Sequence, residues 1–245
     1  MKPLLILQAR NASKRLPGKV MMPVNNMPMI YWQIRRIMKA NVGDLIVATT
    51  LESRDDCLVE FLEENSVTYF RGSADNVAER FREILNMYSA NYFFRLTGDC
   101  PMVMPELIKS MNDYYLENEF DYLSNTLFLS FPDGLDLEII KTESFLKMFE
   151  LELNQMDKEH VTQKIIKNPE IFKLANYKSQ KDLSHLRWTV DYLEDFEFIS
   201  RVFKYFEGRE DEFNLEEALQ ATESGLIEKN TKSSEFRNIA LRESE

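Results

Sequence analysis

The sequence predicts an α/β protein with a mostly parallel, doubly wound sheet. Short apolar runs rich in β-branched and aromatic residues alternate with longer segments whose apolar residues recur at helical spacing. The short runs are apolar on both faces, which is typical of parallel strands covered by helices on either side. The 245 residues, of which 44% are apolar, are enough for one substantial buried core.

The first strands and helices are expected to follow one another in a regular order. Strands are predicted at 4–9, 45–50, 67–70, 92–97 and 120–124, and helices at 28–40, 55–65, 75–88 and 105–118. Asp75 or Asn76 can cap the third helix, and Pro105 suits the first position of the fourth. This alternation is the pattern that predicts the parallel sheet.

The second half of the chain is less regular. We interpret residues 1–245 as a single domain with an insertion at about 126–180, which holds a helical stretch near 142–167. The chain then returns to the main sheet through 186–206. The polar tail from about residue 230 is expected to be peripheral.

Charge and hydropathy exclude several classes of partner. The formal net charge is -11, from 30 Lys plus Arg against 41 Asp plus Glu, and such a surface repels nucleic acid and anionic membranes. The apolar stretch 3–9 is too short for a signal-peptide core with a cleavage site, and no run approaches the roughly 20 apolar residues of a membrane span. We therefore expect a cytoplasmic protein without nucleic-acid or membrane partners, in which an anionic ligand needs a local cationic pocket.

One loop concentrates the positive charge that such a pocket requires. Arg10, Ser13, Lys14, Arg15 and Lys19 follow the first predicted strand. A strand-to-helix loop presents backbone N–H groups to phosphate oxygens, and added cations suit a triphosphate. The loop lacks both the GxxxxGK[ST] pattern of P-loops and the GxGxxG pattern of dinucleotide sites. From these residues alone, a solvated basic turn remains an alternative.

The glycines point to the same edge of the sheet. The chain has only seven, and four of them fall in loops near predicted strand ends: Gly18, Gly72, Gly98 and Gly134. Glycine allows positive φ angles or the close approach of another backbone, although ordinary tight turns would explain each one singly. Ligands of doubly wound sheets bind beyond the carboxyl ends of the strands, so we expect loops 10–20, 71–76 and 97–101 to line a site.

Several motifs, taken in order, resemble a known enzyme family. "QARNASKRLPGKVM" is similar to the ARxxSxRLPGKxL signature of the cytidylyltransferases that activate 3-deoxy-manno-octulosonate and, more distantly, acylneuraminates. The rest of the chain more closely resembles SpsF-type spore-coat polysaccharide cytidylyltransferase-like proteins, through "VATT", "YFRGSADNVAERF", "RLTGDCP", "DYLSN", "FPDGLDLEII", "EHVT" and "RWTVDYLEDF". The resemblance runs from about residue 3 to 206. It implies a Rossmann-like nucleotidyltransferase fold, CTP as substrate, Mg²⁺ as cofactor and usually a homodimer.

The resemblance assigns a nucleotide site and a metal site by matching positions. The residues expected to contact the nucleotide are Gln8, Ala9, Arg10, Ser13, Arg15, Lys19, Arg71, Gly72, Thr97 and Gly98. Asp99 in "TGDCP" and Asp191 in "TVDYLEDF" match two Mg²⁺-binding aspartates, and Lys19, Arg15 and Asp99 are the expected catalytic residues. Taken alone, Asp99 could equally form a turn and Asp191 could cap a helix. Val20 stands where acylneuraminate enzymes carry Asn, which weakens any inference of a sialic-type substrate.

Residues for the acceptor and for dimerisation are predicted from the later motifs. The candidates for acceptor binding are Asp133, Asp136, Glu159, His160 and Arg187. The two aspartates can accept hydrogen bonds from hydroxyls, and Arg187 can pair with a carboxylate bidentately. For His160 a polar position on a helix face is an equal alternative. The insertion is expected to mediate dimerisation through the apolar positions Phe145, Leu146, Met148 and Phe149.

These residue types suit nucleotidyl transfer. When an acceptor hydroxyl attacks the α-phosphorus of CTP, the leaving pyrophosphate gathers charge that Lys19 and Arg15 can neutralise. Mg²⁺ needs only one or two carboxylates besides phosphate oxygens. We therefore predict a cytidylyltransferase that couples CMP to a sugar acid or related hydroxylated metabolite for surface glycan biosynthesis.

Two alternatives to this function stay open. A nucleotide-sugar-dependent glycosyltransferase would be expected to carry a DxD-type metal motif, whereas "GLDLE" at 134–138 has one Asp before Glu138. A non-catalytic nucleotide-binding homologue would not need the retained pair Asp99 and Asp191 or the intact cationic loop.

Overall fold

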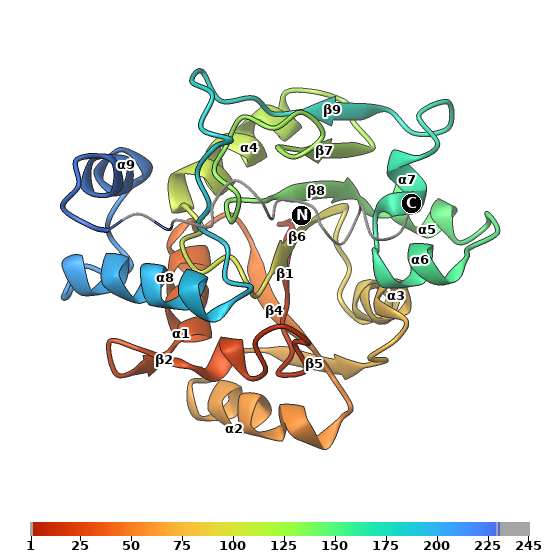
Figure 1. Ribbon diagram of the computed structural model, residues 1–245. Helices are drawn as coiled ribbons and strands as arrows, with labels where there is room; N and C mark the ends of the chain where they lie inside the picture. Colours follow the sequence, from red (N-terminus) through yellow and green to blue (C-terminus); the bar gives the residue numbers. More distant parts are fainter. Residues whose placement is uncertain (1, 229, 231–245) are drawn as a thin grey trace.

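The computed structural model describes residues 2–228 and 230, and a seven-stranded sheet forms its centre (Figure 1). The order of the strands is β5-β4-β1-β6-β8-β7-β9. These strands are β1 (Leu4–Gln8), β4 (Asp44–Thr50), β5 (Tyr69–Gly72), β6 (Tyr92–Thr97), β7 (Tyr122–Ser124), β8 (Glu138–Lys141) and β9 (Leu174–Asn176). A separate antiparallel ribbon pairs β2 (Pro23–Val24) with β3 (Met27–Pro28). The tail predicted to be peripheral lies, except for Asn230, outside the described residues.

Most strand pairs of the sheet are parallel. β1 pairs in parallel with β4 and β6, β4 with β5, and β7 with β9. Only β8 runs the other way, antiparallel to both β6 and β7. The mostly parallel α/β class predicted from the sequence is therefore confirmed, and the five predicted strands form with ends shifted by no more than two residues.

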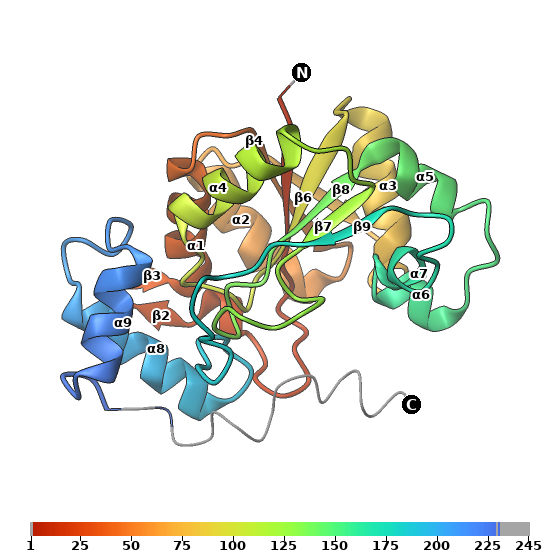
Figure 2. The ribbon, with the colours of Figure 1, turned by 90° about the horizontal axis from the view of Figure 1, so that it is seen from above.

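Helices cover both faces of the sheet. The longer helices are α1 (Met29–Lys39), α2 (Asp56–Glu64), α3 (Val77–Met87), α4 (Pro105–Leu116), α8 (Leu193–Tyr205) and α9 (Leu215–Glu223). Side chains of α1, α2, α4 and α8 pack on the face that includes Leu5 and Leu7, whereas α3 packs on the face that includes Leu4 and Ile6. Figure 2 shows α3 on the other side of the sheet from α1 and α4. This double burial explains why the strands are apolar on both faces.

Local chemistry sets where the helices begin. Asn76 caps α3, since its Oδ1 accepts a hydrogen bond from the backbone N–H of Glu79 at 3.1 Å. Pro105 occupies the first turn of α4, where its missing N–H costs nothing. Among the described residues, no helix is both long enough and apolar enough to cross a membrane.

The segment 126–180 adds both strands and helices to the domain. It supplies β8 and β9 to the main sheet and places α5 (Thr142–Met148), α6 (Gln155–Glu159) and α7 (Gln163–Ile166) on the α3 side (Figure 2). The single helical stretch predicted at 142–167 is thus divided into three short helices. Asn154 starts α6 with a capping box, and Val161, with φ of 39°, interrupts the chain before α7.

Two side chains predicted for dimerisation are core residues instead. Phe145 and Met148 are completely buried within the chain. The ring of Phe145 lies 5.2 Å from that of Phe93 on β6, with the planes nearly perpendicular. The apolar spacing of α5 therefore reflects packing on the sheet, and these two residues are wrong as interface candidates. Leu146 is exposed and Phe149 is partly buried, so for these two residues the interface stays a prediction.

The chain was expected to return to the main sheet through 186–206, but the segment "RWTV" at 187–190 does not do so. It makes only an isolated parallel bridge between Arg187 and Asp133 and does not join the seven-stranded sheet. The backbone of Trp188 passes so close to Gly134 that a Cβ there would lie 2.5 Å from the Trp188 carbonyl carbon. Glycine is needed at that position for this approach. The segment still packs against the loop after β6, because the N–H of Val190 donates to the carbonyl of Asp99 at 2.8 Å.

Candidate active site

A cavity of about 590 Å³ lies at the carboxyl ends of β1 and β6. The loop after β1, the start of α3, α6 and the segment before α8 complete its walls. The predicted site residues that line it are Gln8, Ala9, Arg10, Ser13, Arg15, Lys19, Thr97, Gly98, Asp99, Glu159, His160 and Asp191. The cavity occupies the edge of the sheet at which doubly wound folds bind ligands.

The cationic loop after β1 is anchored by a buried carboxylate. The backbone N–H of Asn11 donates to Oδ1 of Asp55 at 2.7 Å, and the hydroxyl of Thr50 donates to the other oxygen. At its far end the loop closes when the N–H of Gly18, with φ of 74°, donates to the carbonyl of Asn11 at 2.9 Å. The sequence did not indicate Asp55, since nothing in "SRDD" distinguishes it from the exposed Asp56 that follows.

Gly98 allows the two main loops of the site to touch. Its N–H donates to the carbonyl of Gln8 at 2.8 Å, and a Cβ at this position would lie 3.0 Å from the Cβ of Ala9. A larger residue would push the exits of β1 and β6 apart. Because the exits are in contact, Asp99 faces the side chain of Lys19.

Lys19 is the point at which the predicted site residues meet. Its ammonium donates to the carbonyl of Val190 at 2.6 Å, to Oδ1 of Asp191 at 3.1 Å and to Oδ2 of Asp99 at 3.5 Å. Burial alone would lower the pKa of Lys19, but Asp99 and Asp191 outweigh it and raise the pKa. In the same way burial raises the pKa of Asp99, but Lys19 and nearby hydrogen bonds lower it overall. Both groups are therefore charged at neutral pH.

A wider ion-pair network extends from Asp191. Nη2 of Arg15 lies 2.6 Å from Oδ1 of Asp191, and Nη2 of Arg187 lies 3.3 Å from Oδ2. The Arg187 guanidinium also binds Asp133 at 2.8 Å and Asp195 at 2.9 and 3.0 Å. Arg187 is only 3% exposed, so three carboxylates engage it inside the protein. Its contact with Asp191 joins the cationic loop to the start of α8.

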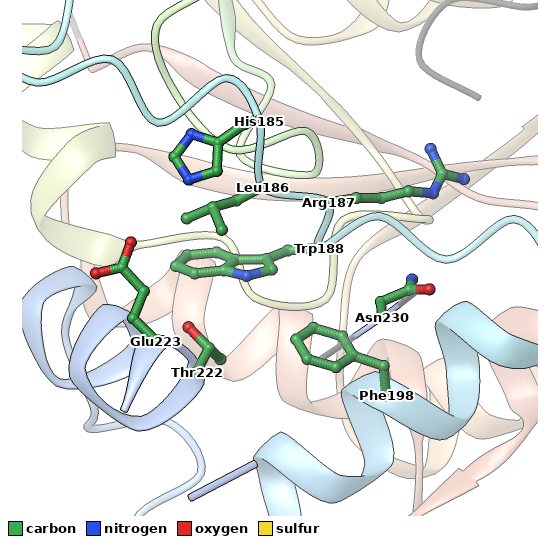
Figure 3. A pocket seen from close by; sticks show the side chains of 8 residues that line it. All are labelled: His185, Leu186, Arg187, Trp188, Phe198, Thr222, Glu223 and Asn230. Carbon is green, nitrogen blue, oxygen red and sulfur yellow. The ribbon is translucent and has the colours of Figure 1, made fainter. Parts of the chain in front are cut away.

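Arg187 and its neighbours border a second, smaller cavity of about 220 Å³ (Figure 3). Trp188 and Phe198 provide its apolar walls, and Thr222 and Glu223 come from α9. Figure 3 shows the side chain of Arg187 extending away from Thr222 and Glu223. The structure thus separates Arg187, Asp133 and Asp136 from the lining of the larger cavity, and their role in acceptor binding stays a prediction.

Arg71 and Gly72 also lie outside the lining of the larger cavity. The Arg71 guanidinium donates to the carbonyls of Thr50 and Glu52 at 2.8 and 3.0 Å, and it pairs with Asp56 at 2.8 Å. These contacts hold Arg71 against the loop after β4. Its contact with the nucleotide remains a prediction.

The carboxylates of the cavity suit a divalent cation. Mg²⁺ prefers oxygen ligands and needs one or two carboxylates when phosphate oxygens complete its coordination. Asp99 and Asp191 converge on the Lys19 ammonium, so their oxygens already surround a cation. Within residues 2–228 and 230, there is no group of three or more His, Cys, Asp or Glu side chains that could hold a metal ion. Phosphate oxygens would therefore have to complete the coordination. The assignment of Asp99 and Asp191 as ligands of Mg²⁺ fits their chemistry and stays a prediction.

Three lining residues, Val77, Arg95 and Met156, were not predicted, whereas Lys14 and Val20 belong to the loop 10–20 that was expected to line the site. Arg95 is the most informative of them because it brings a guanidinium to the cavity from the middle of the sheet. Alternation along "YFFRLT" places Arg95 on the same face as Thr97, which was predicted. That alternation was the signal that could have found it.

A cationic cavity at the carboxyl ends of a mostly parallel sheet, faced by two carboxylates, defines an α/β enzyme that handles a phosphorylated ligand. Comparison with known proteins identifies the family. The chain belongs to the cytidylyltransferases, whose family model matches residues 4–232. It is therefore a CTP-dependent nucleotidyltransferase.

Three known proteins show how far the similarity reaches. A cytidylyltransferase from Leptospira borgpetersenii serovar Hardjo-bovis is 30% identical with a TM-score of 0.87, covering 91% of this chain and 94% of that chain. The spore coat polysaccharide biosynthesis protein SpsF of Bacillus subtilis is 28% identical over 209 residues, which cover 82% of this chain and 86% of its own. CMP:2-keto-3-deoxy-manno-octonic acid synthetase complexed with CTP, at 17% identity and a TM-score of 0.63, covers 84% of this chain and 99% of that chain and shares the fold. The resemblance and the nucleotidyltransferase fold predicted from the sequence are confirmed.

Proposed function

We propose that the protein transfers CMP from CTP to a hydroxyl of a sugar acid or related hydroxylated metabolite, with release of pyrophosphate. The observation that carries this proposal is the convergence of Lys19, Asp99 and Asp191 beside the cationic loop. A role in surface glycan biosynthesis is part of the proposal and is supported by the name of the SpsF relative. A cytoplasmic location belongs to it as well, because CTP is made inside the cell.

The cavity residues can divide the reaction between them. Arg10, Ser13, Arg15 and Lys19 line the cavity, and we expect them to bind the triphosphate and to neutralise the charge that gathers on the leaving pyrophosphate. The acceptor oxygen forms a bond to the α-phosphorus while the bond to the bridging oxygen of pyrophosphate breaks, and the hydroxyl proton leaves to solvent or to a nearby base. Mg²⁺, when bound by Asp99 and Asp191 with the nucleotide, supplies further charge neutralisation at the phosphates.

Pyrophosphate release tests the proposed reaction directly. The purified chain is incubated with Mg²⁺, one nucleoside triphosphate at a time and a panel of sugar acids and hydroxylated metabolites. We expect release that requires both CTP and one class of acceptor, that stops in EDTA and that returns with Mg²⁺ or Mn²⁺. Release that is equally fast with every triphosphate, or that persists in EDTA, contradicts the proposal, as does the absence of release with the whole panel.

A homodimer is the remaining part of the proposed function. It is supported by the family resemblance found in the sequence and by apolar side chains that stay exposed on the chain, such as Phe128.

A further inference from the structure

Arg95 occupies an unusual position for a charged side chain. It lies on β6, between two neighbouring strands of the sheet, and its side chain is only 17% exposed. Nη1 donates to Oε2 of Glu138 at 2.9 Å, whereas Nη2 makes only a long contact of 3.4 Å with Oε1 of Gln8. Since Arg95 lines the cavity, Nη2 can donate to a ligand there without giving up the bond to Glu138.

Glu138 holds this guanidinium by one hydrogen bond and is itself held by two hydroxyl groups. While Oε2 accepts from Arg95, Oε1 accepts from the hydroxyl of Tyr122 at 2.9 Å and from the hydroxyl of Thr162 at 3.1 Å. Thr162 directly follows the turn that carries His160, and Val161 between them has φ of 39°, a strained value for a β-branched residue. Glu138 therefore holds both Arg95 and the turn that brings His160 to the same cavity.

The charges around Arg95 favour a bound anion. The guanidiniums of Arg10 and Arg95 both act on Arg80, which is 1% exposed and has no hydrogen-bond partner for its Nε. Burial, together with Arg10 and Arg95, lowers the pKa of Arg80 to about 10. Arg10 and Arg95 also line the cavity, so positive charge from both guanidiniums reaches an anion bound there.

We propose that Arg95 is the residue that selects an acceptor with a carboxylate, and that Glu138 is its positioning residue. The inference rests on the proposed function, in which Arg15 and Lys19 serve the triphosphate. Asp99 also acts on Arg95, but it is already paired with Lys19. Because only Nη1 of Arg95 is bound to Glu138, the guanidinium has further N–H groups to donate. Its planar arrangement of donors matches the two oxygens of a carboxylate.

The variants are chosen to remove the charges without leaving one of them unpaired. The double variant Arg95→Gln with Glu138→Gln neutralises both partners together, which avoids a buried lone carboxylate. Arg95→Lys keeps the charge but loses the fork of donors, so it tests the same contact if the double variant does not fold. Tyr122→Phe is the matched control, because it removes one bond to Glu138 and leaves the ion pair intact.

Binding is measured by calorimetry on the full chain saturated with CTP in EDTA, so that no turnover interferes. The probes are 3-deoxy-manno-octulosonate, N-acetylneuraminate and D-glucuronate, each compared with its methyl ester. We expect wild type and Tyr122→Phe to bind at least one acid on the order of 10²-fold more tightly than its ester, as loss of a hydrogen bond to a charged group implies. The double variant should bind acid and ester alike with unchanged affinity for CTP, and Arg95→Lys should retain only part of the preference.

Each result decides the matter. If no acid binds to wild type more tightly than its ester, or if the variants of Arg95 keep the full preference, the assignment of Arg95 is overturned. If an acid shows the preference and the variants lose it, the assignment stands even when no acid gives turnover. In that last case pyrophosphate release fails, and it is the proposed function that is wrong.

Discussion

Lys19 holds, in the free protein, the position at which two candidate metal ligands converge. Its ammonium lies between Asp99 and Asp191 and is 8% exposed. Lys19→Met removes this ammonium and leaves the two carboxylates free to attract a different cation, such as a metal ion. We expect the variant to bind Mn²⁺ without nucleotide, as measured by the loss of the free Mn²⁺ signal in electron paramagnetic resonance. Its turnover should fall by on the order of 10², since a charge-stabilising contact is lost.

Lys14→Met is the control for this experiment. Lys14 belongs to the same loop but is exposed, so its removal changes the net charge by the same amount. Neither this variant nor wild type should bind Mn²⁺ without nucleotide. Equal binding by wild type and Lys19→Met would show that the ammonium does not occupy the metal position.

Site residues that belong to one local motif were predicted correctly from the sequence. Residues whose role depends on partners far away along the chain were predicted less well. Arg15 and Lys19 belong to one loop motif, and the structure places both in the cavity. Arg187 was predicted from its charge alone, and its pairing with Asp133, which is 54 residues away, could not be read from the motif. Arg95 could have been found from the alternation along its own strand, but its pairing with Glu138, which is 43 residues away, could not.

The first turn of α8 shows how one carboxylate organises a whole element. Asp195 accepts hydrogen bonds from the backbone N–H groups of Asp191 and Tyr192, both at 3.0 Å, and from Arg187. Burial raises the pKa of Asp195, but the bonds from Arg187 and from Asp191 outweigh it and lower the pKa below its usual 3.8. Asp195 therefore fixes the positions of Asp191 and Arg187 relative to the start of α8.

This depressed pKa predicts how stability depends on pH. Because the unfolded chain binds the proton first, Asp195 stabilises the fold above its unfolded pKa and loses that contribution as pH falls from about 5 towards its folded pKa. Asp195→Asn should lower the free energy of unfolding at pH 7 by about 3–5 kcal/mol, as the loss of one partner of a buried pair does. It should also flatten the decline in acid. Urea unfolding between pH 2 and 7 measures both effects, because the range then extends below the usual pKa of 3.8 of an aspartate.

Glu64→Gln provides the comparison, because it removes one negative charge at an exposed position at the end of α2. Its urea midpoint should follow that of wild type across the whole pH range. An Asp195→Asn variant with the same pH slope as Glu64→Gln would contradict a role for Asp195 in acid stability.

Helices with an uninterrupted apolar repeat were predictable from the sequence. Helices that are ended by a capping residue or by a positive φ angle were not. Helices α1 to α4 match their predicted ranges because their apolar residues recur over 9 to 12 residues. The stretch at 142–167 has a similar composition, yet the capping box at Asn154 and the positive φ of Val161 divide it. "RWTV" looks like a strand, but its backbone bonds go to Asp133 and Asp99 instead of a sheet neighbour.

Within residues 2–228 and 230, the sheet ends at β5 on one side and at β9 on the other. In this part of the chain β9 pairs only with β7, over three residues (Figure 1). Beside it, the backbone N–H of Phe128 donates to the side chain of Asn176 at 2.9 Å. Phe128 is 73% exposed and Leu129 is 40% exposed. An open strand edge flanked by apolar side chains is a surface suited to pairing with another chain.

We expect this surface to join two copies of the chain. Each copy carries a net charge of -11, so the copies repel one another at long range and their contact has to be largely apolar. Light scattering at micromolar concentration should give twice the 28.9 kDa of one chain. Phe128→Ser should reduce the mass to that of one chain, whereas Met38→Ser, at a side chain 59% exposed on α1, should leave the dimer intact. A wild-type mass near 28.9 kDa would exclude the dimer, and a dimer that survives Phe128→Ser would place the contact on another surface.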